Sequence, residues 1–122
     1  MHTLMRKQQV RADKVFLIRN FLSKQECDYF ISQSEALGFE MAPITTSLGP
    51  VLYPEIRSNG RVMVDDPGLA VNLFERARPY LPETIASWQM LGLNERFRFF
   101  RYRPGEKFAP HYDGAFQRNH NE

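Results

Sequence analysis

His111 and Asp113 form the pair of residues in this sequence whose types and spacing best support a chemical role. In an extended strand, side chains two positions apart leave the same face, and their Cα atoms lie roughly 6.6 Å apart along the chain. One imidazole and one carboxylate on the same face can bind a single divalent cation of borderline character. The spacing therefore predicts a metal-binding pair.

The residues in front of this pair predict two strands joined by a turn. The run from Phe97 to Tyr102 is rich in aromatic side chains. Pro104 and Gly105 follow it, and this dipeptide is a strong turn signal because proline presets φ at one central position while glycine accepts a positive φ at the next. A hairpin-like reversal is expected here, with the metal-binding pair on the returning strand.

A longer pattern around the pair resembles a known family. It is similar to the approach to the iron site in 2-oxoglutarate-dependent oxygenases of the prolyl 4-hydroxylase type, and consists of Arg101-Tyr102, Pro104-Gly105, Phe108 and Pro110-His111-X-Asp113-Gly114. In non-haem Fe(II) oxygenases, two histidines and one carboxylate occupy one face of an octahedron. The resemblance implies that His111 and Asp113 are metal ligands and catalytic residues. It also implies that Tyr102 lies in the pocket of the co-substrate 2-oxoglutarate, whereas the residue type alone fits a strand aromatic that fills the barrel equally well.

Members of this family continue with further strands that carry a distal histidine ligand and a basic residue for the far carboxylate of 2-oxoglutarate. This sequence ends at Glu122, and His120 is the one histidine after Asp113. Facial coordination needs a ligand held across the barrel, so neither His120, in a polar terminal run, nor His2 is expected to be the third ligand. The chain is expected to be the N-terminal part of an oxygenase domain and to be inactive alone.

Length and composition predict one globular domain spanning residues 1–122. The sequence is 43% hydrophobic and 25% charged, as in ordinary soluble proteins. Its net charge is +2, and the 16 basic residues are scattered among 14 acidic ones, so no nucleic-acid partner is expected. The arginines between Arg96 and Arg103 alternate with aromatics, as an RNA-binding strand could, but the glycine-rich signature of the common RNA-recognition strand is absent.

The location of the protein is predicted from its single cysteine and from its hydropathy. Cys27 cannot form an internal disulfide, which favours a reducing compartment. Its place on an apolar helical stripe indicates a small buried side chain rather than a nucleophile. No apolar signal region and no run of 18 apolar residues is present, so we expect a cytoplasmic protein with no membrane partner.

The first part of the chain predicts a strand and a helix. Residues 1–13 are polar and expected to be loosely held, whereas residues 15–18 are strand-forming. Ser23 and Glu26 form a capping box that begins a helix, and Gly38 is placed to end it. The apolar stripe of this helix is expected to pack on a sheet.

The middle of the chain predicts a long loop and two further helices. Residues 39–60 are interrupted by prolines and glycines, and a long loop with short extended pieces is expected. Asn59 and Arg61 resemble the substrate-side region of the family, while a solvated turn explains them equally well. Asp65-Asp66-Pro67 predicts a helix start, and a third, shorter helix with Trp88 in the core is expected to end at Gly92.

The aromatic strand is expected to be covered on both faces. Phe97 and Phe99 share one face, and Arg98, Phe100 and Tyr102 share the other. Helices would cover one face and the barrel interior the other. Arg98 is a candidate for the substrate side, although an ion-pair partner on the barrel rim is the favoured alternative.

These observations predict an α+β fold in which N-terminal helices and an added strand (residues 1–93) pack on the opening strands of a jelly-roll-like double-stranded β-helix (residues 94–122). The resemblance implies an Fe(II)- and 2-oxoglutarate-dependent dioxygenase. It would use molecular oxygen and ascorbate to hydroxylate a prolyl or other side chain of a protein or peptide, or a small-molecule substrate. The alternative is a non-catalytic remnant that acts as a binding module through an exposed sheet edge.

Overall fold

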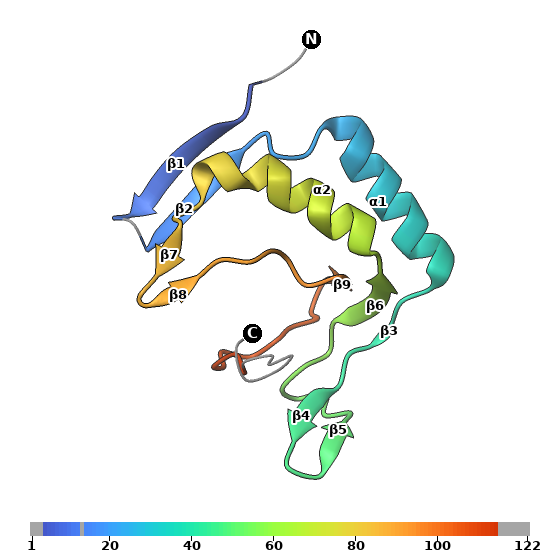
Figure 1. Cartoon of the computed structure of the whole chain (residues 1–122). Coiled ribbons are helices and arrows are strands. Elements are labelled where there is room, and N and C mark those ends of the chain that lie inside the picture. The colour runs from blue at the N-terminus through green and yellow to red at the C-terminus, as the bar shows by residue number, and fades with distance from the viewer. Residues whose placement is uncertain (1–3, 13, 115–122) are drawn as a thin grey trace. The chain divides into compact units, whose positions relative to one another are not determined.

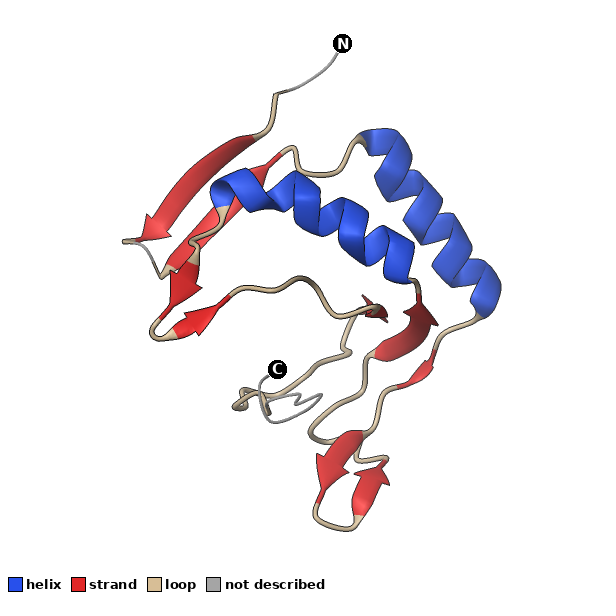
Figure 2. Ribbon diagram, viewed as in Figure 1, coloured by secondary structure: helices blue, strands red, loops and turns tan. Residues whose placement is uncertain are grey.

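The computed structural model of the 122-residue chain describes residues 4–12 and 14–114. These residues form a mixed α+β fold with two α-helices and several small antiparallel sheets (Figures 1 and 2). No closed barrel is present in the described ranges. The chain divides into two compact units, a first unit of Met1–Phe39 with Val62–Phe99 and a second unit of Glu40–Arg61 with Phe100–Glu122.

The first unit begins with a hairpin of β1 (Arg6–Arg11) and β2 (Val15–Arg19), which pair antiparallel. Strand β2 was predicted, but the expectation that residues 6–11 are loosely held is wrong. Polar side chains do not prevent a strand from forming when its backbone groups pair with a neighbour. One long side chain of β1 also contacts β2, with the Lys7 ammonium 4.3 Å from the centre of the Phe16 ring.

Helix α1 (Lys24–Leu37) confirms the predicted capping box. The Ser23 hydroxyl accepts a hydrogen bond from the Glu26 amide at 3.1 Å, and the Glu26 carboxylate accepts one from the Ser23 amide at 2.9 Å. Gly38 ends the helix with φ +87°, a conformation that glycine adopts without steric cost. Its apolar stripe packs on a sheet only in part, since Ile31 and Leu37 on that stripe are exposed.

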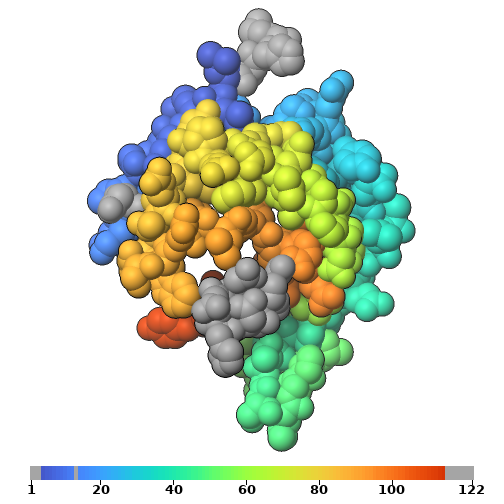
Figure 3. Space-filling model, in the orientation of Figure 1, coloured from blue at the N-terminus to red at the C-terminus, as the bar shows by residue number. Residues whose placement is uncertain are grey.

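The second helix, α2 (Pro67–Ala77), also begins where predicted, with the Asp66 carboxylate accepting a hydrogen bond from the Leu69 amide at 2.9 Å. A 3₁₀ turn, η1 (Arg78–Tyr80), follows it. The Tyr80 hydroxyl lies 3.5 Å from the carbonyl oxygen of Met5. Figure 3 accordingly shows the yellow end of α2 and η1 beside the blue residues of the N-terminal hairpin.

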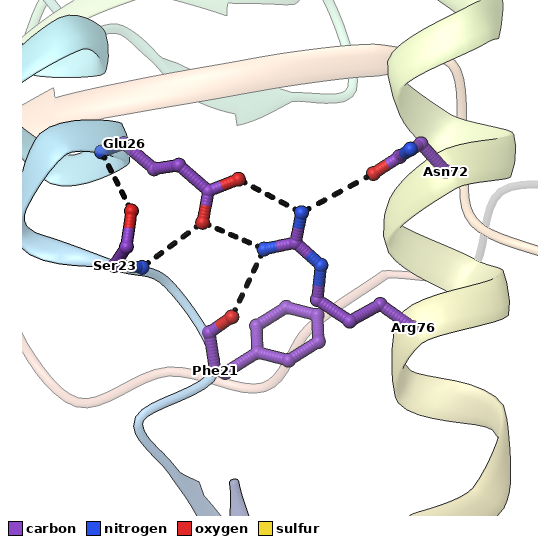
Figure 4. Close-up of polar contacts among 5 residues, drawn as sticks. All are labelled: Phe21, Ser23, Glu26, Asn72 and Arg76. Atoms are coloured by element: carbon purple, nitrogen blue, oxygen red, sulfur yellow. Dashed lines mark hydrogen bonds and ion pairs between the residues drawn. The ribbon is translucent and has the colours of Figure 1, made fainter. Parts of the chain in front are cut away.

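An arginine of α2 joins the two helices of the first unit (Figure 4). The Arg76 guanidinium donates two hydrogen bonds to the carboxylate of Glu26, at 2.7 and 2.8 Å, and a third to the carbonyl of Phe21 at 3.0 Å. The hydrogen bonds from Arg76, followed by the one from the Ser23 amide, lower the pKa of Glu26 to about 2. Glu26 thus caps α1 and binds α2 with the same carboxylate.

The predicted third helix is wrong. Residues 84–89 form a hairpin of β7 (Thr84–Ile85) and β8 (Trp88–Gln89), and the Trp88 side chain is exposed rather than in the core. The apolar spacing that suggested a helix also fits two short strands joined by a two-residue turn, and Thr, Ile and Trp are residues that favour strands. The turn begins at Ala86, whose φ is +54°.

The second unit contains β3 (Glu40–Met41) and the hairpin of β4 (Ile44–Thr46) with β5 (Gly49–Val51). The long loop with extended pieces predicted for residues 39–60 is therefore confirmed. Strands β6 (Gly60–Asp65) and β9 (Arg96–Arg101) each have residues in both units, and β6 lies between β3 and β9 in a three-stranded sheet.

Strand β9 shows the predicted alternation but not the predicted burial of both faces. Phe97 and Phe99 are half-buried, and the Phe30 ring of α1 packs 6.0 Å from the Phe99 ring. Phe100 on the opposite face and Tyr102 just after the strand are 44% and 51% exposed. In the described part of the chain, no helix is both long enough and apolar enough to cross a membrane.

Candidate metal centre

The turn in front of the candidate site has the predicted geometry. The amide of Glu106 donates a hydrogen bond to the carbonyl of Arg103 at 2.9 Å, with Pro104 and Gly105 between them. Gly105 has φ +85°, as the third residue of a type II turn requires. The Glu106 carboxylate also accepts a hydrogen bond from the Arg103 amide at 2.8 Å, so two hydrogen bonds link Arg103 and Glu106 across the turn.

The returning strand predicted after this turn is wrong. Residues 109–114 are irregular, and the pairing after the turn consists of one antiparallel bridge between Phe108 and Arg57, extended by a hydrogen bond from the Ala109 amide to the Ile56 carbonyl at 2.8 Å. Pro110 has no amide hydrogen with which to continue a ladder. The argument that strand periodicity aligns the metal-binding pair therefore fails.

The side chains of His111 and Asp113 nevertheless meet. Nε2 of His111 lies 3.1 Å from Oδ1 of Asp113, and Nδ1 of His111 lies 2.8 Å from the carbonyl oxygen of Ala109. A carbonyl oxygen only accepts, so Nδ1 donates a hydrogen bond to Ala109, whereas the contact between Nε2 and the carboxylate needs either a proton or a cation between the two atoms. In metal sites, a histidine commonly binds the metal through one ring nitrogen while a backbone carbonyl holds the other.

The separation of the two atoms fits a shared cation. In octahedral coordination, two neighbouring ligands at about 2.1 Å from the metal lie about 3.0 Å apart. Nε2 and Oδ1 are 3.1 Å apart, which matches the separation of two such neighbouring ligands and is also the length of a direct hydrogen bond. The side chains are 40% and 92% exposed, which leaves the remaining coordination positions open to other ligands.

Among the described residues, the candidate site has two potential ligands and not three. Within residues 4–12 and 14–114, no group of three or more His, Cys, Asp or Glu side chains is arranged to hold a metal ion. His2 and His120, the weaker candidates for a third ligand, lie outside the described residues.

Two side chains that were not predicted as site residues, those of Phe108 and Arg57, support the candidate site. The His111 ring stacks on the Phe108 ring with a centroid distance of 3.8 Å and an interplanar angle of 10°. The Arg57 guanidinium carbon lies 4.0 Å from the centre of the Phe108 ring and 4.9 Å from that of Phe100. Phe108 belongs to the pattern around the pair and could have been found there, but Arg57 is distant in sequence and no local signal marks it.

Asn59, a predicted substrate-side residue, is fully buried. Its Oδ1 accepts a hydrogen bond from Nε of Arg57 at 3.0 Å, and its Nδ2 donates one to the carbonyl of Gly60 at 3.1 Å. Its own carbonyl accepts a hydrogen bond from the Ala42 amide at 2.9 Å. In this structure the Asn59 side chain has no surface to offer a substrate, and it holds Arg57 instead.

Two other predicted residues, Arg61 and Tyr102, belong to the same unit as His111 and Asp113. Arg61 is half-buried on β6, opposite Glu40 of β3 in the second unit. Tyr102 follows β9 in the same unit with 51% of its surface exposed. Among the described residues, the structure joins His111 to Asp113 but shows no hydrogen bond or ring contact from either to Tyr102 or Arg61.

Arg98 lies in the first unit, on the exposed face of β9. Its neighbour Arg96 donates hydrogen bonds of 2.8 and 3.1 Å to the Asp65 carboxylate. These hydrogen bonds, and to a smaller extent the charge of Arg98, hold the pKa of Asp65 below its usual range. This arrangement agrees with the alternative that Arg98 is part of a surface ion-pair group.

In comparisons with known proteins, no family model, curated protein or solved structure matches the chain. A functional assignment therefore depends on the sequence pattern around His111 and on the geometry of the metal-binding pair.

Proposed function

We propose that this chain carries two ligands of the iron site of an Fe(II)- and 2-oxoglutarate-dependent dioxygenase. One observation carries the proposal: His111 has Nδ1 bound to the Ala109 carbonyl and Nε2 placed 3.1 Å from the Asp113 carboxylate. An imidazole and a carboxylate at this spacing suit Fe(II), and they are two of the three ligands in the facial sites of non-haem oxygenases.

Each of these residues has a defined part in the proposed site. His111 would bind the metal through Nε2, and Asp113 would bind it through Oδ1 while lowering the net charge of the bound cation. Tyr102 is proposed to contact 2-oxoglutarate, with its phenol in the exposed part of the second unit. When bound, Fe(II) would supply the reaction of molecular oxygen with 2-oxoglutarate, which yields succinate and carbon dioxide and hydroxylates a substrate.

The remaining parts of the site are proposed to come from a continuation of the polypeptide. A jelly-roll-like double-stranded β-helix would add the distal histidine and the basic residue for the far carboxylate of 2-oxoglutarate. Protein, peptide and small-molecule substrates are all compatible with the residues present, and ascorbate would keep the iron reduced. A cytoplasmic location is part of the same proposal, since the chain has one cysteine.

The proposal is tested by succinate production from purified chain supplied with Fe(II), 2-oxoglutarate and ascorbate. Two protein ligands hold iron weakly because affinity depends on ligand number and on a preformed site, so we expect little or no turnover by these 122 residues. A longer polypeptide with the distal histidine should turn over, and Asp113→Ala should abolish its activity. Turnover of the longer form that survives Asp113→Ala would refute the proposal.

A non-catalytic binding module is the second candidate, and one observation favours it. The β4–β5 hairpin and the residues after it expose Leu48, Val51 and Leu52, with Leu48 96% exposed. Exposed apolar side chains next to short strands are typical of surfaces that bind another chain. A partner or second copy that binds the wild-type chain but not Leu48→Ser, with no metal bound at His111, would favour this candidate.

A further inference from the structure

Phe108 separates two groups that stack on it. The His111 ring lies 3.8 Å from it at an interplanar angle of 10°, and the Arg57 guanidinium carbon lies 4.0 Å from the same ring centre. One face of a phenyl ring has room for one planar group at these distances. The imidazole and the guanidinium therefore lie on opposite faces, and the three side chains form a stack in the order Arg57, Phe108, His111.

The Arg57 end of this stack is fixed inside the second unit. Arg57 is buried at 8% exposure. Its Nε donates a hydrogen bond to Asn59 at 3.0 Å, and its Nη1 donates one to the carbonyl of Pro43 at 3.4 Å. The Arg57 backbone also pairs with Phe108 in the antiparallel bridge. A buried guanidinium held at these points gives the Phe108 ring a rigid support.

The His111 end of the stack is at the surface, where little else limits the ring. Its side chain is 40% exposed, and the residues after it are irregular and exposed. The Ala109 carbonyl accepts from Nδ1 at 2.8 Å and the Asp113 carboxylate lies 3.1 Å from Nε2, but contacts at the ring edge leave the ring plane free to tilt. The face of Phe108 removes that freedom and so determines where Nε2 points.

We propose that Arg57 is a positioning residue for His111: acting through Phe108, it fixes the imidazole plane and with it the direction in which Nε2 points. This inference rests on the proposed iron site, but the stack itself can be measured without metal. Cation–π attraction makes Phe108 more strongly held by a guanidinium than by an apolar side chain of similar length. Supporting contacts of this kind behind a metal ligand affect metal affinity by about 10- to 100-fold.

The test combines NMR of the His111 ring with Mn(II) titration. In the wild-type chain, the His111 ring protons should be shifted upfield by Phe108. Arg57→Met and Phe108→Leu should each reduce the upfield shift and weaken Mn(II) binding about tenfold. Phe108→Tyr, which keeps a ring, should leave both quantities close to their wild-type values.

Controls separate positioning from a loss of structure. Arg103→Met removes an exposed arginine of the same unit and should change neither the ring shift nor the Mn(II) affinity. Exchange protection of the Ser58 amide, which donates to the Lys107 carbonyl at 2.8 Å, reports whether the unit remains folded in each variant. If Arg57→Met does not fold, Arg57→Lys, which keeps the charge but loses the planar fork, should show the same changes to a smaller degree.

The outcomes distinguish this inference from the proposed function. An unchanged ring shift and Mn(II) affinity in folded Arg57→Met and Phe108→Leu would overturn the positioning role while leaving the iron site in place. If the His111 ring shift responds to these substitutions as expected, but replacing His111 leaves the Mn(II) affinity unchanged, the stack is supported and the iron site is refuted.

Discussion

Replacing the buried Asn59 with alanine should destabilise the second unit by roughly 2–4 kcal/mol. The substitution removes two side-chain hydrogen bonds, one from the Arg57 guanidinium at 3.0 Å and one to the Gly60 carbonyl at 3.1 Å. A hydrogen bond from a charged donor contributes about 1.5–3 kcal/mol and a neutral one about 0.5–1.5 kcal/mol. Because Asn59 has no exposed surface, water cannot replace either bond without rearrangement.

Native-state hydrogen exchange measures this loss in the unit where it occurs. The amides of Ala42, Ser58 and Ala109 donate backbone hydrogen bonds within the second unit. Each step of about 1.4 kcal/mol changes the equilibrium constant for opening of the unit by a factor of ten. If the free energy of opening falls by roughly 2–4 kcal/mol, these amides should exchange about 30- to 1000-fold faster. Amides of α1 in the first unit serve as an internal reference.

Asn94→Ala is the matched control for this substitution. The Asn94 side chain is exposed and accepts a hydrogen bond from the Arg96 amide at 2.9 Å in the first unit. Exposed hydrogen bonds contribute less, because water replaces the lost partner, so the second-unit amides should exchange at the wild-type rate. If Asn59→Ala leaves the exchange of Ala42 and Ser58 unchanged, the buried hydrogen bonds do not support the unit and our reasoning about Arg57 is wrong.

Three further predictions concern capping, acid stability and the turn. Ser23→Ala should lower the stability of the first unit by about 1 kcal/mol because it removes the side-chain cap of α1, and Ser23→Asp should restore most of it in urea unfolding followed by circular dichroism. The pKa of Glu26 falls from its usual 4.5 to about 2 in the folded state. The ionised carboxylate therefore contributes fully to the free energy of unfolding above pH 4.5, and this contribution is lost as the pH falls from 4.5 to 2. Glu26→Gln should flatten that decline in stability, and an unchanged pH profile would contradict the role of Arg76. Gly105→Ala should cost about 1–2 kcal/mol through its positive φ alone, since an added Cβ meets no atom within 4 Å, and faster exchange of the Glu106 amide should report it.

The sequence predicted the elements whose signals are local. Ser23 and Asp66 cap their helices through residues three positions away, and such caps are recognisable in any context. The turn at Pro104 and Gly105 was predicted for the same reason. In contrast, strand β1 (Arg6–Arg11) has no apolar pattern, because its strand forms by backbone pairing with β2, and local composition does not report that pairing.

The helix predicted around Trp88 failed because a short apolar run fits more than one structure. Ile85, Trp88 and Leu91 are spaced three apart, as on a helix face, yet the strand pair β7–β8 accommodates the first two as well. Only the rest of the fold decides between these arrangements.

The contact between His111 and Asp113 was predicted, but not the way in which it forms. His111 and Asp113 do meet, but through an irregular segment held by the Ala109 carbonyl and the Phe108 ring rather than through strand periodicity. The support by Arg57 could not be predicted, because it depends on an antiparallel bridge between segments distant in sequence. Contacts of that kind follow from the tertiary fold and leave no periodic signal in the chain.

The central claim, that His111 and Asp113 together bind a divalent metal, is tested most directly by paramagnetic Mn(II) added to the chain and observed by NMR. The sequence contains three histidines, so their imidazole signals can be compared in one sample. We predict that Mn(II) broadens the His111 signals before those of His2 and His120, and that Asp113→Ala removes this preference. Equal broadening of all three histidines, or selective broadening of His111 that persists in Asp113→Ala, would contradict the assignment.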